Sequence, residues 1–457
     1  MKFVFITYEF YPFPLALHLM DEGREVLIGV VENYEDIGLG PSKNKEKPEE
    51  RKMRLSNYDG LIEKDTLKDV FEFLKKVPES EKDDYFFFFD YSDMYKVSEK
   101  ILDMGFKNGL FPTEFYYEME KDRQRAKEFV KENYDRVKVA EAHDFKKIED
   151  GIELINSSDD IYVLKSNGNL GKTVVPVGDN ANIARMILTN TLQKYRKDYE
   201  AQGFMLEKKI LNALEVTPVM VFYDGKPVYS LVEFENKEYG AGNIGVQKGG
   251  NQALSGRTKL SAEINKIAFP EIIYELAKAQ PGLSIFDAGL LYDGKDFWFT
   301  EFCAMRYGWD GIFSEIVMRD NGKPFVADYF EDIIKGQNPL KNKYGASLRL
   351  FNLEGNPEET ENAESGAPMY WDESIENNLF LYRAKEKDGE IVSVGDVDAL
   401  GVMTAAGNSI NSAVEKLYER IDKFYFEKLY YRPKFDFLST DYGSSILSRM
   451  EALKKFL

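Results

Sequence analysis

The sequence predicts a mixed α/β and α+β fold divided among several domains. Its 457 residues exceed the size that one hydrophobic core usually supports. The chain starts with a strand–helix–strand pattern, which is typical of a parallel sheet. Further along, hairpin patterns include a strand that ends at an acidic residue, and residues 345–435 combine short strands with a helix near 409–424. These features together favour an α/β start followed by α+β domains.

The first 112 residues have the pattern of a small α/β domain. The loop at 8–14, between the first strand and the first helix, contains no glycine and is therefore not a dinucleotide fingerprint. The charge run at 41–54 interleaves acids with bases, which favours an exposed loop over a nucleic-acid patch. The elements expected here are strands at 3–7, 25–31 and 85–89 and helices at 15–20, 66–76 and 94–104.

The middle of the chain alternates helical and hairpin patterns. Residues 114–134 predict one amphipathic helix, and a hairpin is expected where 161–166 and 172–177 flank a glycine-containing loop. Residues 239–250 are glycine-rich, and we expect them to be irregular. The other predicted elements are helices near 180–198 and 261–279 and strands at 204–207, 216–223 and 227–235.

A hairpin pattern between Asp287 and Glu301 carries the strongest chemical signal. Two alternating apolar runs flank a turn at Asp293-Gly294, the second run ends at Glu301, and Arg306 follows five residues later. Mg²⁺ takes one or two carboxylates together with phosphate oxygens, and an arginine can cover the charge of a transferred phosphoryl group. The alternative is a surface hairpin with ordinary charges.

Composition excludes several classes of function. The formal net charge of −19 disfavours binding to nucleic acids and to anionic membranes. With one cysteine and two histidines, the chain forms no intramolecular disulfide, and a Cys-based zinc site or a Ser-His-Asp triad is improbable. The chain shows no signal peptide and no membrane-spanning run, so we expect a cytoplasmic protein.

Two further segments have the composition of a nucleotide site. In the loop 165–174, two glycines let backbone N–H groups approach a phosphate and two lysines add positive charge, although the spacing is not that of a Walker A loop. In the segment 204–216, a strand ends at Glu207 and a second acid follows at Glu215, which suits an adenosine pocket. The alternatives are a plain hairpin turn and two solvated glutamates.

The C-terminal segment 444–457 predicts an amphipathic helix. Its apolar stripe favours core packing or self-association over a membrane anchor. A homodimer, or an assembly through this helix, is therefore left open. The stripe consists of Ile446, Leu447, Met450, Leu453 and Leu457.

The order of these parts resembles the ATP-grasp superfamily: Asp122-Arg123, then Lys165 with its loop, the two glutamates of segment 204–216, and the hairpin at 287–301. Within it, the sequence looks most like phosphoribosylamine–glycine ligase (glycinamide ribonucleotide synthetase), an enzyme of purine biosynthesis. The similarity spreads over roughly residues 112–435, and the segment 380–418 follows the closing strand–strand–helix pattern of that family.

The resemblance implies an ATP-grasp fold with an N-terminal Rossmann-like domain and a C-terminal strand-rich domain. The implied boundaries are 1–112 for the first domain, 113–335 for the ATP-grasp domain with a lid at about 145–215, 336–435 for the α+β domain and 436–457 for the tail helix. The implied cofactors are ATP and Mg²⁺, or Mn²⁺.

The resemblance also implies roles for single residues. Arg306 and Lys237 would serve catalysis, Glu301 and Asp287 would bind the metal, and Gly249, Gly250 and Asp310 would contact substrates. The residues implied in ATP binding are Arg123, Lys165, Gly168, Gly171, Lys172, Glu207 and Glu215.

The departures from the family are concentrated where its substrates would lie. Cys303 stands where the family has an asparagine metal ligand, and soft sulfur suits Mg²⁺ poorly. The loop at 8–14 contains Pro12 and Pro14 in place of a glycine-rich turn, and proline has no N–H to offer a sugar phosphate. The residues implied in ATP binding match the family better than the residues at the substrate positions do.

The sequence therefore predicts an ATP-dependent carboxylate–amine ligase that acts through an acyl phosphate and has altered substrates. Its partners would be small-molecule carboxylate and amine substrates, with no nucleic acid and no membrane. The alternative is a catalytically weakened ATP-grasp relative that serves as a nucleotide-binding or structural assembly protein. Retention of Lys165, Glu301 and Arg306 favours the enzyme, whereas Cys303 favours the alternative.

Overall fold

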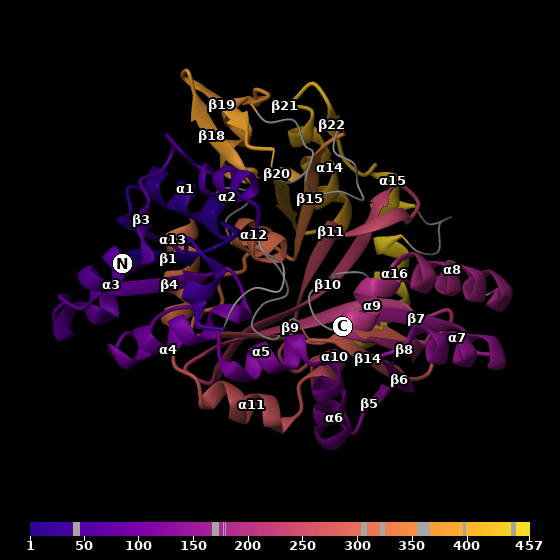
Figure 1. Ribbon diagram of the computed structural model, residues 1–457. Helices are drawn as coiled ribbons and strands as arrows, with labels where there is room; N and C mark the ends of the chain where they lie inside the picture. Colours follow the sequence, from indigo (N-terminus) through magenta and orange to yellow (C-terminus); the bar gives the residue numbers. More distant parts are fainter. Residues whose placement is uncertain are drawn as a thin grey trace. The chain divides into compact units, whose positions relative to one another are not determined.

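The computed structural model divides the chain into two compact units. Figure 1 shows its helices and strands. Unit 1 contains Met1–Tyr117, Thr217–Asp287 and Cys303–Leu457, and unit 2 contains Glu118–Val216 and Ala288–Phe302. This two-way division does not test the predicted four-part domain layout, which stays a prediction. The structure describes residues 1–39, 46–166, 173–176, 178, 180–302, 309–319, 325–353, 366–395, 399–439 and 445–457.

The start of unit 1 is a parallel sheet with the strand order β3-β2-β1-β4, which confirms the predicted strand–helix–strand start. Its strands β1, β2 and β4 are largely apolar because both faces of the sheet are covered there. The elements are β1 (Lys2–Thr7), β2 (Val26–Val30), β3 (Asp65–Thr66), β4 (Tyr85–Phe89), α1 (Phe13–Asp21), α2 (Pro48–Leu55), α3 (Leu67–Leu74) and α4 (Tyr95–Asp103).

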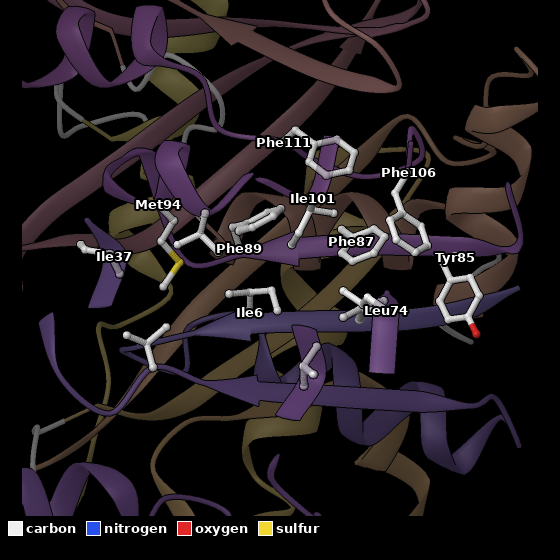
Figure 2. Close-up of a cluster of buried hydrophobic side chains, with 14 of the residues drawn as sticks. Ile6, Ile37, Leu74, Tyr85, Phe87, Phe89, Met94, Ile101, Phe106 and Phe111 are labelled. Atoms are coloured by element: carbon white, nitrogen blue, oxygen red, sulfur yellow. The ribbon is translucent and has the colours of Figure 1, made fainter. Parts of the chain in front are cut away.

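The aromatic run of β4 supplies the core on both faces of this sheet. Phe87 and Phe89 are fully buried in one hydrophobic cluster, together with Ile6 of β1 and Ile101 of α4 (Figure 2). Phe86 and Phe88 point to the opposite face, where their ring centroids lie 5.0 and 4.9 Å from that of Phe330 on α13 (Val326–Ile334). Alternation along the strand therefore fixes the sheet between two apolar layers.

The rest of unit 1 is built on a largely antiparallel sheet. β10 (Lys226–Gly240) and β11 (Ile244–Thr258) form its longest hairpin, so the prediction of irregular structure at 239–250 was wrong. The glycines are accommodated by register shifts between Asn236 and Gly240, which are typical of β-bulges. The other strands are β12 (Leu283–Asp287), β15 (Tyr344–Asn352), β17 (Leu379–Leu381), β20 (Ala399–Gly407) and β22 (Leu429–Tyr430).

Helices and small strand pairs complete unit 1. The α16 stripe is largely buried in its own unit, since Ile446, Met450 and Leu453 are core residues. Core packing of this stripe is what the structure shows, and self-association through the helix stays a prediction. The elements are α10 (Glu263–Ala268), α11 (Glu271–Lys278), α12 (Trp309–Met318), α14 (Ile410–Ile421), α15 (Phe435–Leu438), α16 (Ile446–Leu453), β16 (Tyr370–Trp371), β18 (Ala384–Lys387), β19 (Glu390–Ser393) and β21 (Phe424–Tyr425).

Unit 2 contains the sheet order β6-β8-β7 and the predicted hairpin, in which β13 (Gly289–Tyr292) pairs with β14 (Phe297–Glu301). β9 (Leu214–Tyr223) contributes residues to both units. The other elements are α7 (Ile148–Ser157), α8 (Ala181–Lys194), α9 (Arg196–Gln202), β5 (Val137–Val139), β6 (Ala142–Phe145), β7 (Tyr162–Ser166) and β8 (Phe204–Lys208).

The helix predicted at 114–134 is instead two helices, α5 (Glu114–Lys121) and α6 (Arg123–Asn133). Asp122 separates them because its carboxylate caps the second helix, accepting a hydrogen bond from the N–H of Arg125 at 2.9 Å. The hydrophobic periodicity of the sequence continues across this break, so only the capping residue Asp122 indicates it. Within the described ranges, no helix combines the length and apolar character needed to cross a bilayer.

Candidate functional site

Unit 2 holds a buried group of charges that we call the lysine–glutamate triad: Lys127, Lys165 and Glu207. Lys165 of β7 donates to Oε1 of Glu207 on β8 at 2.7 Å, and Lys127 of α6 donates to Oε2 of the same carboxylate. The β7–β8 register pairs Lys165 with Met205, which places its side chain diagonally from Glu207 on one face of the sheet. All three residues are at most 6% exposed.

The triad is electrostatically unbalanced. Burial raises the pKa of Glu207, but Lys165 and Lys127 outweigh burial and hold it below its usual range. With all three groups ionised, two ammonium charges face one carboxylate, which leaves one net positive charge in a buried place. Each ammonium has three N–H donors and gives one to Glu207, so further donors remain for the oxygens of an anion.

A second ion pair lies near the start of α6. Arg123 Nη1 lies 3.4 Å from Oε2 of Glu301, the last residue of β14, and both side chains are partly exposed. Lys127 follows Arg123 by four residues, so the two cations share one face of α6. The sequence prediction missed Lys127, although this i,i+4 spacing of basic residues is the signal that could have identified it.

The remaining predicted residues of the nucleotide site are placed in part. Glu215 lies on β9 opposite Leu291 and is partly buried. The carboxylate of Glu207 is engaged on both oxygens by lysines, and its predicted contact with adenosine stays a prediction. Gly168, Gly171, Lys172 and Arg306 lie outside the described residues, as does Cys303.

Unit 1 holds a second group of charged residues, on one face of β10, of which Glu233 is buried. Glu233, Glu235 and Lys237 alternate along the strand, and we call them the β10 acidic face. Lys237 Nζ lies 3.7 Å from Oε2 of Glu235. A Cβ added at Gly250 on β11 would come within 2.6 Å of Oε1 of Glu235, so the carboxylate lies against bare backbone there.

Glu233 has no such cation. It is 2% exposed, and among the described residues its side chain makes no hydrogen bond. Burial raises the pKa of Glu233 well above its usual range, and the charges of Glu235, Glu315 and Asp310 raise it further. Asp287, the buried last residue of β12, acts in the same direction.

Asp310, by contrast, is fully partnered. Arg349 Nε donates to Oδ2 of Asp310 at 2.6 Å, and the Tyr382 hydroxyl donates to Oδ1 at 2.7 Å. Arg349 Nη1 also donates to the carbonyl oxygen of Lys248, and a Cβ at the next residue, Gly249, would lie 3.3 Å from Nη1. The structure thus brings Asp310 and Gly249 to the same arginine.

Asp90 organises the loop that follows β1. Its fully buried carboxylate accepts hydrogen bonds from the Thr7 hydroxyl at 2.8 and 2.9 Å and from the backbone N–H groups of Tyr8, Glu9 at 2.6 Å and Tyr11 at 3.2 Å. Phe10, within this loop, has a positive φ of 64°. Successive N–H groups that converge in this way form an anion-binding nest, and here the anion is part of the chain.

The residues predicted to bind the metal are Glu301 and Asp287. Glu301 offers one partly exposed carboxylate in unit 2, and Asp287 belongs to unit 1. Across the described ranges, no three or more His, Cys, Asp or Glu side chains group closely enough to hold a metal ion. A single carboxylate still suits Mg²⁺ when phosphates and water supply the other oxygens. Glu301 therefore fits an ion that arrives with a nucleotide.

The sequence matches no family model and no curated protein. The structure, however, resembles solved enzymes along nearly their whole length. It is similar to phosphoribosylamine–glycine ligase from Thermotoga maritima, with a TM-score of 0.63 and 17% identity over 94% of this chain and 99% of that one.

Two further similarities involve carboxylases. Biotin carboxylase from Campylobacter jejuni, solved as a β,γ-ATP complex, gives a TM-score of 0.57 and 13% identity over 99% of this chain and 96% of that one. The second is the biotin carboxylase domain dimer of Hydrogenobacter thermophilus 2-oxoglutarate carboxylase, solved with MgADP, ADP and bicarbonate. It gives a TM-score of 0.54 and 12% identity over 94% of this chain and 91% of that one. The chain therefore has the ATP-grasp fold that these ligases and carboxylases share.

Proposed function

We propose that the chain is an ATP-dependent ligase that joins a carboxylate to an amine through an acyl phosphate. The observation that carries this proposal is the lysine–glutamate triad of unit 2. A buried excess of positive charge with unused N–H donors is suited to nucleotide phosphates. The ATP-grasp fold, which the solved ligases share, supports the same reading.

In this proposal, Lys165 and Lys127 bind ATP phosphates, and Arg123 adds a third cation from the same face of α6. Glu207 holds both lysines in place, while Glu215 accepts hydrogen bonds from the ribose. Glu301 would hold Mg²⁺ or Mn²⁺, which would neutralise part of the phosphate charge. Gly168, Gly171 and Lys172 are proposed to cover the phosphates, and Arg306 to face the transferred phosphoryl group.

The proposed reaction has two steps. A carboxylate oxygen of the acid substrate attacks the γ-phosphorus, the bond to the β,γ-bridging oxygen breaks, and ADP leaves. The amine nitrogen then attacks the acyl carbon, the bond from that carbon to the phosphate oxygen breaks, phosphate leaves, and the nitrogen loses a proton. Asp310, Gly249 and Gly250 of unit 1 are the proposed substrate residues, Lys237 is a proposed catalytic residue, and Asp287 is a second candidate metal ligand.

The test is an ADP-release screen over pairs of carboxylic acids and amines, with phosphoribosylamine plus glycine as the first pair. We expect ADP release that needs both substrates and Mg²⁺, and that is lost in Lys165→Ala. Lys208→Ala is the matched control, because Lys208 follows Glu207 on β8 but is half-exposed and paired with Asp160. ADP release that is equal with and without the acid would contradict a ligase.

Cys303 supports a second candidate, a nucleotide-binding relative with weakened catalysis. Sulfur in place of an amide oxygen is a poor partner for Mg²⁺. This candidate predicts that ATP binds with the same dependence on Lys165, but that no acid and amine pair releases ADP. Restoring the oxygen ligand with Cys303→Asn should then produce turnover, whereas in an active ligase it should change the metal preference.

A further inference from the structure

The β10 acidic face carries a buried carboxyl, Glu233, that has no cation and no hydrogen-bond donor among the described residues. Glu235 has Lys237 at 3.7 Å, and Asp310 has Arg349 at 2.6 Å. Glu233 instead has acidic neighbours, Glu235, Glu315 and Asp310, whose charges raise its pKa. A carboxyl that is 2% exposed and makes no hydrogen bond costs stability, so a binding partner of positive charge would relieve it.

A comparison with Glu315 shows how the same unit treats a buried carboxyl that serves packing. Glu315 is fully buried, but its Oε2 accepts hydrogen bonds from the hydroxyls of Tyr229 and, at 3.0 Å, Tyr329. Among the described residues, Glu233 has no hydroxyl, amide or guanidinium in that role, so it lacks the partners that packing supplies to Glu315.

The ligand is better matched by an ammonium group than by a divalent metal. In the part of the chain that the structure describes, no group of three or more potential metal ligands is present in either unit. An ammonium group needs only a few hydrogen-bond acceptors, and Glu233 and Glu235 offer carboxylate oxygens from one strand face.

A phosphorylated amine is disfavoured by the loop after β1. The N–H groups of Tyr8, Glu9 and Tyr11 converge as in an anion-binding nest, and the Asp90 carboxylate already accepts hydrogen bonds from all three. A phosphate placed there would meet a buried carboxylate of like charge. The N–H groups of this loop are therefore already occupied by the Asp90 carboxylate.

We propose that Glu233 binds the ammonium group of the amine substrate, which releases one proton to solvent before its nitrogen attacks the acyl carbon, and that this amine is a small organic cation without a phosphate group. This inference rests on the proposed ligase function and narrows its substrate class. Glu235 is the second acceptor of the same site, held in place by Lys237 and by the bare backbone at Gly250.

A binding experiment that needs no turnover tests the site. The thermal unfolding midpoint of the full chain is measured in ammonium or methylammonium chloride against sodium chloride at equal ionic strength, and separately in MgCl₂. We expect wild type to be stabilised by ammonium and methylammonium, and Glu233→Gln to lose this shift. Glu315→Gln, the matched buried control, should keep it. A Glu233-dependent shift in MgCl₂ alone, or no ammonium-specific shift in wild type, would overturn the proposal.

Kinetics separate this inference from the function on which it rests. In Glu233→Gln, the KM for the amine should rise about 10- to 100-fold while the Kd for ATP is unchanged, as expected for loss of one charge-assisted contact. An unchanged amine KM, or best turnover with phosphoribosylamine, would refute the ammonium site while leaving the ligase intact. Absence of ATP binding in wild type would instead refute the ligase, and the ammonium shift would still report on Glu233.

Discussion

The lysine–glutamate triad and the β10 acidic face both contain buried charged residues, yet their charges are arranged in opposite ways. In the triad, two cations share one carboxylate, and every member has a partner. On the acidic face, Glu235 has a cation, whereas Glu233 faces further acids. The excess lysine of the triad suits an anion, as we propose for unit 2, and the carboxyl of Glu233 without a partner suits a cation, as we propose for unit 1.

The two regions also differ in their response to pH. Lysine charges hold the pKa of Glu207 below its ordinary value of 4.5, so its stabilising effect is complete above about pH 4.5 and is lost as the pH falls further. Burial raises the pKa of Glu315, next to the acidic face, to about 8. The folded state then holds an extra proton between pH 4.5 and 8, so this contribution is lost as the pH rises through that window.

The largest effect is expected at Glu301, where a metal would complete the anion site. Glu301→Gln should fold normally but lose Mg²⁺-dependent ATP turnover by more than about 100-fold, since even the outer partners of a metal ligand are worth about 10- to 100-fold. Steady-state ADP release over a range of Mg²⁺ and Mn²⁺ concentrations measures this. Glu141→Gln, an exposed acid of the same unit, is the control. Turnover that survives Glu301→Gln would make Glu301 only a strand residue.

The next effect concerns the triad. Lys165→Ala should weaken ATP binding by roughly 1–3 kcal/mol, the range for a charge-assisted contact. Lys127→Ala should do the same, and the double variant should lose less than the sum, because both lysines act through one carboxylate. Calorimetry with ATP gives the three values. Equal ATP affinity in wild type and Lys165→Ala would mean that Lys165 does not bind ATP, and the proposed difference in ligand between the two regions would then be wrong.

The smallest effect is the pH response of unit 1. Removing the titration with Glu315→Gln should flatten the loss of stability that wild type shows between about pH 5 and 8, at most about 1.4 kcal/mol per pH unit. Urea unfolding at several pH values measures the difference, with the exposed Glu415→Gln as a control. Parallel curves for wild type and Glu315→Gln would mean that the folded carboxyl titrates normally.

The fold could be predicted from sequence where local patterns decide it. The aromatic run 85–89 and the hairpin before Glu301 have clear strand periodicity and lie where expected. The segment 239–250 was mistaken for a loop, because its glycines break the strand signal while the long hairpin partner supplies the pairing. Strand pairing between distant segments is a tertiary effect that no local window contains.

The sequence identified only part of the candidate site. Lys165 and Glu207 were singled out, but their mutual ion pair was not, because the register of β7 and β8 places them together. Lys127 and Glu233 were missed altogether. A lysine on a charged helix and a glutamate in a strand look solvated in sequence, and only burial shows that they are 2% exposed.

The three-segment construction of unit 1 has a consequence for how the chain is made. Unit 2 has all its residues once Phe302 is synthesised, whereas His18 waits for the carbonyl of Leu379, 361 residues later, and Tyr58 for that of Leu381. At about 5–20 residues per second, the wait for Leu379 lasts roughly 20–70 s. Until Phe330 emerges, the face of the first segment that carries Phe86 and Phe88 lacks the cover of α13, so the nascent N-terminal region is expected to be a chaperone client until the last third of the chain emerges.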